Sequence, residues 1–134
     1  MGSQVRDISA LEGAPLSQLD LTRCSQISDF SVLKTLSSVS DLKVGHTQLK
    51  DLSVINGEPL RLLDIAGLSI TDLSPLAGMN LQSLNLSKTP VKDLTPIVGM
   101  PLTRLSPPPK DQLTTDSLKL IEQLQKQGCS ITWE

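Results

Sequence analysis

The sequence predicts an α/β solenoid: a right-handed superhelix with a parallel sheet on its concave side, short 3₁₀ turns on its convex side and a helix–strand cap at its C-terminal end. Two observations carry this prediction. A short apolar phrase begins at residues 16, 39, 60, 81 and 102, with gaps of 23, 21, 21 and 21 residues. The chain has one Phe, one Trp and no Tyr, so its core must consist of Leu, Ile and Val. Repeats this short cannot bury their own apolar side, so successive copies must stack around one shared core.

A strand is expected in each repeat. In the copy at residues 60–80, Leu60, Leu63 and Ile65 occupy positions 0, +3 and +5, and the last two have the two-residue period of a strand. The corresponding pairs in other copies are Leu19 and Leu21, Leu42 and Val44, and Leu84 and Leu86. These residues should form aligned rows that face the core.

The convex side should carry short turns. Ser74-Pro75 and Thr95-Pro96 are typical of a helix N-cap followed by proline at the first helical position. Gly57, Gly78 and Gly99 follow within a few residues, so each segment fits one 3₁₀ turn better than a full helix. Each glycine is expected to supply the backbone conformation that returns the chain to the next strand.

An aspartate occupies one fixed place in every repeat. The five residues are Asp7, Asp29, Asp51, Asp72 and Asp93. One interpretation is an acidic ridge that binds calcium. The preferred interpretation is that each carboxylate accepts backbone N–H groups at its turn, because each stands alone, without the clustered oxygen ligands of a calcium site.

These motifs resemble the leucine-rich repeat family, whose pattern is LxxLxLxx. The tail IxDLSPLxGM, seen at 70–79 and 91–100, is similar to the bacterial, internalin-like variety of these repeats with 21 residues per turn. The resemblance implies a protein that presents a binding surface, but this fold hosts many unrelated binders.

One position departs from the family pattern. The family often places Asn after the strand, where its amide links neighbouring turns. Here the position holds Cys24, Thr47, Leu68 and Thr89. A leucine cannot make that hydrogen bond, so the resemblance implies that the third turn is less well tied.

The chain divides into three expected parts. Residues 1–4 look like a leader introduced by cloning, residues 5–106 are repeats, and residues 107–134 form a C-terminal cap with a helix at about 115–127 and a strand at about 129–133. We expect Trp133 to pack over the last turn, with an exposed binding anchor as the alternative. The array begins in mid-repeat, so we expect a fragment of a longer protein or an open N-terminal turn available for end-to-end contact.

Composition restricts the partners. The net charge is −2 and the basic residues are scattered, which argues against nucleic-acid binding. Neither a membrane-spanning segment nor a signal peptide is visible. Cys24 and Cys129 lie about five strand steps apart, on the order of 20 Å, which is too far for a disulfide. This favours an intracellular location, although the compartment itself is not specified.

No catalytic residue, metal site or cofactor is predicted. His46 is the only histidine, and it should lie on an outward column while Cys24 faces inward, so the two should not form a nucleophilic pair. Asp20 and Asp64 would be about 9–10 Å apart, near the spacing of an inverting glycosidase, but no sugar cleft accompanies them. We expect both carboxylates to lie on a solvated face.

The residues that alternate with the core should face the concave side and form the binding surface. They are Gln18, Asp20, Asp41, Lys43, Leu62, Asp64, Ser83, Asn85 and Arg104, with the small residues Thr22, Gly45, Ala66 and Ser87 beside them. We therefore predict a monomeric, non-catalytic protein–protein interaction module whose partner the sequence does not identify. The alternative is a regulatory or targeting segment of a larger bacterial signalling enzyme, such as a serine/threonine kinase; more repeats behind a secretion signal would instead indicate a surface adhesin.

Overall fold

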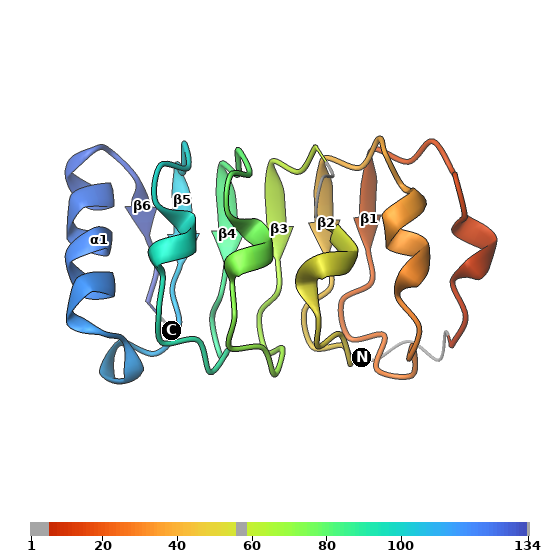
Figure 1. The fold of residues 1–134 in the computed structure, drawn as a ribbon, viewed down its shortest axis with the longest axis horizontal. Helices are drawn as coiled ribbons and strands as arrows, with labels where there is room; N and C mark the ends of the chain where they lie inside the picture. Colours follow the sequence, from red (N-terminus) through yellow and green to blue (C-terminus); the bar gives the residue numbers. More distant parts are fainter. Residues whose placement is uncertain (1–5, 56–58, 134) are drawn as a thin grey trace.

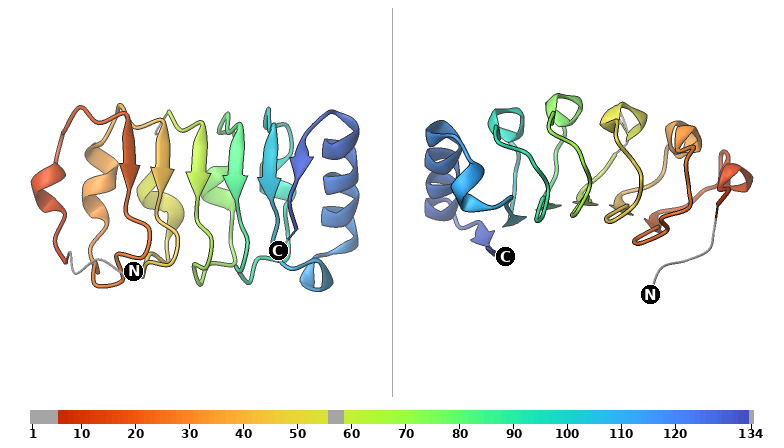
Figure 2. Two further views of the ribbon diagram at one scale, coloured as in Figure 1. Left: turned by 180° about the vertical axis from the view of Figure 1, so that it is seen from behind. Right: turned by 90° about the horizontal axis from the view of Figure 1, so that it is seen from below.

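The computed structural model describes residues 6–55 and 59–133 and shows a stack of chain turns (Figure 1). Within these residues, six parallel strands form one sheet in chain order. The strands are β1 Gln18–Asp20, β2 Asp41–Lys43, β3 Leu62–Asp64, β4 Ser83–Asn85, β5 Arg104–Ser106 and β6 Ser130–Ile131. The stack is curved, with the strands along its inner side and the short helical turns along its outer side (Figure 2).

In the described residues, short 3₁₀ turns line the outer side and one α-helix lies at the C-terminal end of the stack. The turns are η1 Ser9–Leu11, η2 Ser31–Thr35, η3 Leu52–Ile55, η4 Ser74–Leu76, η5 Thr95–Ile97 and η6 Lys110–Gln112, and the helix is α1 Thr115–Lys126. This arrangement confirms the predicted solenoid with a parallel concave sheet, a convex side of short turns and a helix–strand cap.

The central leucines of the strands stand in one row. The register pairs Leu19 with Leu42, Leu42 with Leu63, Leu63 with Leu84 and Leu84 with Leu105. All but Leu19 are almost completely buried, and Leu19 packs partly buried against the same core. Burial of each such side chain contributes about 1.5–3 kcal/mol, so this row and the parallel rows of the convex turns account for most of the stability.

The convex turns are held by aspartate side chains. The Asp72 Oδ1 atom accepts the backbone N–H of Ser74 at 2.8 Å, and the Asp93 Oδ1 atom accepts that of Thr95 at 3.0 Å. Asp7, Asp29 and Asp51 make the same bond to the second residue after them. The expectation that this column serves the backbone is confirmed.

The prediction that Ser74 and Thr95 cap these turns is wrong. The N-cap positions belong to Leu73 and Leu94, neither of which makes a side-chain capping bond. Ser74 and Thr95 are already the first residues of η4 and η5, and the proline follows at the second position. The capping acceptor therefore comes from the aspartate two residues earlier.

Glycine returns the chain from the convex side. Gly78 and Gly99 have φ angles of +83° and +85°, a region that residues with a Cβ atom adopt only with strain. This is the conformation expected for them. Gly57, for which the same role is predicted, lies outside the described residues.

The C-terminal segment closes one end of the core. Thr114 caps α1, its side chain accepting the N–H of Ser117 at 3.2 Å. The helix buries Ile121 and Leu124 against the last turn. The chain then turns at Gly128, where φ is +100°, and β6 pairs with β5 so that the sheet continues into the cap.

The last aromatic residue does not pack as expected. Trp133 is 38% exposed, and the Lys110 Nζ atom lies 5.6 Å from the centre of its ring. Cys129 is buried and Ile131 is partly buried, so the apolar face of this strand becomes progressively more exposed toward Trp133. The reason is position: Trp133 follows β6, which among the described strands pairs with β5 alone.

Candidate functional site: the concave face

The concave face consists of two rows of side chains that run across the strands. The parallel register sets one row from the first residue of each strand and a second row two residues further on. The first row is Gln18, Asp41, Leu62, Ser83, Arg104 and Ser130. The second row is Asp20, Lys43, Asp64, Asn85 and Ser106, and Thr132 lies beside its end. The structure thus brings all nine predicted surface residues onto one face, each of them exposed or partly exposed.

The half of this face over β1–β3 is acidic. Gln18, Asp20, Asp41, Lys43 and Leu62 line a hollow of about 380 Å³. The Gln18 Nε2 atom donates to the Asp41 Oδ2 atom at 3.3 Å, which links β1 to β2. Hydrogen bonding from Thr22, through its side chain and its backbone amide, lowers the pKa of Asp20, and the nearby Lys43 lowers it further. Asp20 is therefore a firmly ionised carboxylate at neutral pH.

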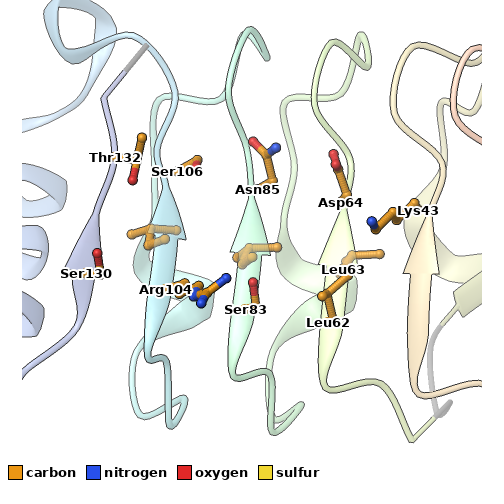
Figure 3. A pocket seen from close by; sticks show the side chains of 12 residues that line it. Lys43, Leu62, Leu63, Asp64, Ser83, Asn85, Arg104, Ser106, Ser130 and Thr132 are labelled. Atoms are coloured by element: carbon orange, nitrogen blue, oxygen red, sulfur yellow. The ribbon is translucent and has the colours of Figure 1, made fainter.

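The half over β4–β6 has a different character. A second hollow of about 480 Å³ is floored by small polar side chains: Ser83, Asn85, Ser106, Ser130 and Thr132 (Figure 3). Arg104 rises from β5, and its guanidinium extends toward Ser83 on β4. Lys43 and Asp64 form the rim on the β2 and β3 side.

Two side chains of the second row are oriented by the backbone beside them. The Asp64 Oδ1 atom accepts the N–H of Ala66 at 3.0 Å, and the Asn85 Oδ1 atom accepts the N–H of Ser87 at 3.0 Å and its hydroxyl at 2.8 Å. Because Asn85 uses its oxygen in this way, its NH₂ group remains the part that can serve a ligand.

The small residues that follow the second row, Thr22, Gly45, Ala66 and Ser87, are also expected on this face. That expectation is wrong for three of the four. Ala66 and Ser87 are buried, at 6% and 2% exposure, and Gly45 is buried as well, whereas Thr22 is partly exposed. β3 ends at Asp64 and β4 ends at Asn85, and the chain enters a turn two residues later. Ala66 and Ser87 therefore no longer follow the alternation of the strand. A Cβ atom on Gly45 would lie 3.0 Å from the Ala66 carbonyl oxygen, which shows how closely the turns approach there.

A ridge of four residues with left-handed backbone conformation, one from each of four successive turns, borders the concave face. Arg23, His46 and Lys88 have φ angles of 65°, 57° and 60°, and Gly67 has a φ of 75° in the same column. The His46 imidazole lies directly over Gly67, so closely that no Cβ atom would fit there. Cys24 is instead buried in the core. The thiol and the imidazole therefore lie on opposite sides of the backbone, in agreement with the predicted inward and outward columns.

Among residues 6–55 and 59–133, no group of three or more His, Cys, Asp or Glu side chains is placed to hold a metal ion. The one α-helix of that same part is too short and too polar to cross a membrane.

The sequence prediction omitted part of the face. Ser106, Ser130 and Thr132 line the larger hollow, although the predicted surface ended at Arg104. The predicted cap at 107–134 includes a strand at about 129–133 but assigns none of its residues to the concave face, whereas β6 extends the sheet and contributes to the face. The alternation of Ser130 and Thr132 with Cys129 and Ile131 is the signal that could have revealed these two residues.

Comparison with known proteins identifies structural relatives. No protein-family model and no curated protein sequence matches this chain. Among solved structures, it is similar to the internalin InlF of Listeria monocytogenes, with a TM-score of 0.68 and 29% sequence identity over 78% of this chain and 32% of that protein. It is also similar to internalin C2 of the same organism, with a TM-score of 0.57 and 27% identity over 78% of this chain and 48% of the other. The chain thus spans about a third of the length of the first of these proteins and about half of the second.

Proposed function

Because this chain folds as a leucine-rich-repeat solenoid of the internalin-like variety, we propose that it is a non-catalytic module that binds another protein through its concave face. The observation that carries the proposal is the alignment of exposed side chains from all six strands into two rows on one curved surface. A parallel stack of this kind offers an extended concavity that a folded or extended partner can follow.

The chemistry of the face supports binding rather than catalysis. The carboxylates of Asp20 and Asp64 are both engaged by backbone amides of their own turns. His46 packs on a ridge while Cys24 lies in the core. A nucleophile, a base and an orienting group within hydrogen-bond reach of one another, which nucleophilic catalysis needs, are therefore not supplied by these side chains.

The composition of the face indicates modest affinity. Leu62 is its one large apolar side chain, with Asp41, Lys43 and Asp64 around it, and aromatic anchors of the kind that dominate tight interfaces are not part of either row. Binding should depend on this central leucine and on charge complementarity around it.

The test is partner capture by immobilised domain from extracts of the source cells and of their environment, with bound proteins identified by mass spectrometry. Leu62→Glu combined with Asp64→Lys reverses the chemistry at the centre of the face. We expect this variant to lose the partner that the wild type retains, while its thermal unfolding remains cooperative.

The matched control places the same two kinds of change on the other side of the molecule. Val98→Glu with Glu122→Lys alters an exposed residue beside η5 and an exposed residue of α1. This control should capture the partner normally. Equal capture by all three proteins, or no specific capture by the wild type, would contradict the proposal.

A further inference from the structure

The two halves of the concave face differ in their hydrogen-bonding capacity. Over β1–β3 the two rows hold the carboxylates Asp20, Asp41 and Asp64 and a single lysine. Over β4–β6, by contrast, Arg104 is the one ionised side chain of the two rows, and the hollow's other polar side chains there are serines, a threonine and an asparagine, beside the leucines of β4 and β5. Lys43 and Asp64 stand at the rim of this hollow. One end of the face is therefore rich in acceptors and the other in donors.

The orientation of the polar groups strengthens this difference. The Asn85 side-chain oxygen accepts hydrogen bonds from Ser87, so its NH₂ group can donate to a ligand in the hollow. Arg104 is exposed, and its guanidinium extends toward Ser83 (Figure 3); within the described residues it makes no ion pair and no hydrogen bond. Guanidinium groups bind carboxylates through two parallel N–H bonds, and this one is positioned in an open hollow to do so.

The hollow is wider than a single anion requires. Ser83, Arg104 and Ser130 lie side by side on β4, β5 and β6, a span of about 9–10 Å at the usual strand spacing. Ser106 and Asn85 form a second row two residues further along the strands. Such a floor can hold a carboxylate at its centre and the backbone carbonyls of a chain segment on either side.

From this arrangement we propose that the donor-rich hollow over β4–β6 binds an acidic segment of the partner protein, with a Glu or Asp carboxylate of that segment paired to Arg104 and the hydroxyls of Ser83 and Ser130 donating to its neighbouring oxygens. This inference rests on the proposed function, because it specifies the chemistry of the partner at the same face. The acidic half over β1–β3 repels such a segment and so fixes which end of the face it occupies.

The probe is a fluorescein-labelled synthetic peptide of alternating Glu and Ser, followed by fluorescence anisotropy at low and high salt. Matched peptides carry Gln or Lys in place of Glu. We expect the Glu peptide to bind about tenfold more tightly than the Gln peptide, as one charge-assisted pair would give, and to weaken as salt is added. The Lys peptide should not bind to this hollow.

Arg104→Gln and Lys126→Gln form the matched pair of variants, because both remove one exposed positive charge and only the first lies in the hollow. Arg104→Gln should reduce affinity for the Glu peptide about tenfold, to the level of the Gln peptide. Lys126→Gln should leave it unchanged. Thermal unfolding of both variants should match that of the wild type, since neither side chain is buried.

Several outcomes would overturn the inference: absence of binding, equal binding of the Glu and Gln peptides, or equal loss in the two variants. Competition by free glutarate as effective as by the peptide would show that the hollow takes a small anion instead of a chain segment. If the capture experiment yields a partner that depends on Leu62 but does not compete with the Glu peptide, this inference fails while the proposed function stands. Failure of capture alone would count against the proposed function.

Discussion

The Ser117 hydroxyl of α1 accepts a hydrogen bond from the backbone N–H of Leu94 at 2.8 Å, and this bond joins the C-terminal cap to the last full repeat. Ser117 is completely buried, and its oxygen also lies 2.9 Å from the Thr114 hydroxyl and 3.4 Å from the Lys92 carbonyl oxygen. One small side chain thus serves a backbone donor and a backbone acceptor of the preceding turn. The cap is held by polar groups as well as by the apolar residues Ile121 and Leu124.

Ser117→Ala should destabilise the domain although it removes a single oxygen atom. The substitution leaves the Leu94 N–H without its acceptor in a buried place, for which we expect a loss of about 1–3 kcal/mol in the free energy of unfolding. Urea denaturation would measure the loss. Ser130→Ala, at an exposed position, is the control and should change stability by less than about 0.5 kcal/mol. Equal stability of the Ser117 variant and the wild type would show that the hydrogen bond is replaced by water.

Gly67→Ala should destabilise the ridge for two separable reasons. The φ angle of +75° disfavours any residue with a Cβ atom, and the new methyl group would meet the His46 imidazole. We expect a total loss of about 1–3 kcal/mol by chemical denaturation.

The double variant His46→Ala with Gly67→Ala separates these contributions. Removal of the imidazole relieves the collision but leaves the backbone strain, so the loss from Gly67→Ala should be smaller in the His46→Ala background. Double-mutant cycles resolve couplings of about 0.5 kcal/mol or more between residues in contact. Strict additivity of the two changes would contradict the packing of His46 over Gly67.

Acid should weaken the convex turns. The backbone amide of the residue two positions later, with its side chain second, lowers the pKa of Asp7, Asp29, Asp51 and Asp72 below the ordinary value of 3.8. Because the folded-state pKa of each carboxyl is lowered, each stabilises the folded state fully above its unfolded pKa. That contribution decreases as the pH falls below about 4 and disappears once the pH is below the folded-state pKa.

The test compares the wild type with a variant that carries Asn at residues 29, 51 and 72. Asparagine keeps an oxygen acceptor for the turn but does not titrate. Urea midpoints measured from pH 7 down to pH 2 should fall less steeply in acid for the Asn variant than for the wild type. Parallel pH profiles would show that other groups cause the acid sensitivity.

The repeat spacing was enough to predict the strands, because a gap of 21 residues leaves one way to align Leu42, Leu63 and Leu84 with their neighbours buried. The aspartate column was also predictable, since a carboxylate two residues before a turn can reach a backbone amide without any tertiary contact. The repeat spacing and the short distance from each aspartate to the amide two residues later depend only on neighbouring residues. Both features can therefore be predicted without knowledge of tertiary contacts.

Features that depend on contacts between distant segments were not predictable in the same way. Ser117 is buried where it bonds to backbone groups of Lys92 and Leu94, and Trp133 is exposed although its alternation with Cys129 and Ile131 placed it on the apolar face of the last predicted strand. The larger hollow extends onto β6 because residues from the cap join the sheet. No short-range sequence pattern specifies such contacts between distant segments.

At Leu68, apolar packing takes the place of a side-chain hydrogen bond that the neighbouring turns make. In the neighbouring turns Thr47 and Thr89 donate their hydroxyls to the carbonyl three residues earlier, at 2.7 and 2.8 Å, whereas Leu68 is 1% exposed and packs into the core. Its backbone N–H bonds to the Ile65 carbonyl oxygen at 3.3 Å. The turn therefore has apolar packing in place of the side-chain hydrogen bond.

Leu68→Thr should for this reason destabilise the domain. The sequence-based expectation that the third turn is weakened by the missing hydrogen bond would predict the opposite. A new hydroxyl bond to the Ile65 carbonyl oxygen would contribute about 0.5–1.5 kcal/mol, and loss of the buried leucine removes about 1.5–3 kcal/mol. We expect a net loss of about 1 kcal/mol in the free energy of unfolding. The reverse change, Thr89→Leu at the equivalent buried position, tests whether packing or hydrogen bonding decides there as well. A Leu68→Thr variant more stable than the wild type would mean that the hydroxyl bond outweighs the packing, and that this turn lacks a tie that its neighbours possess.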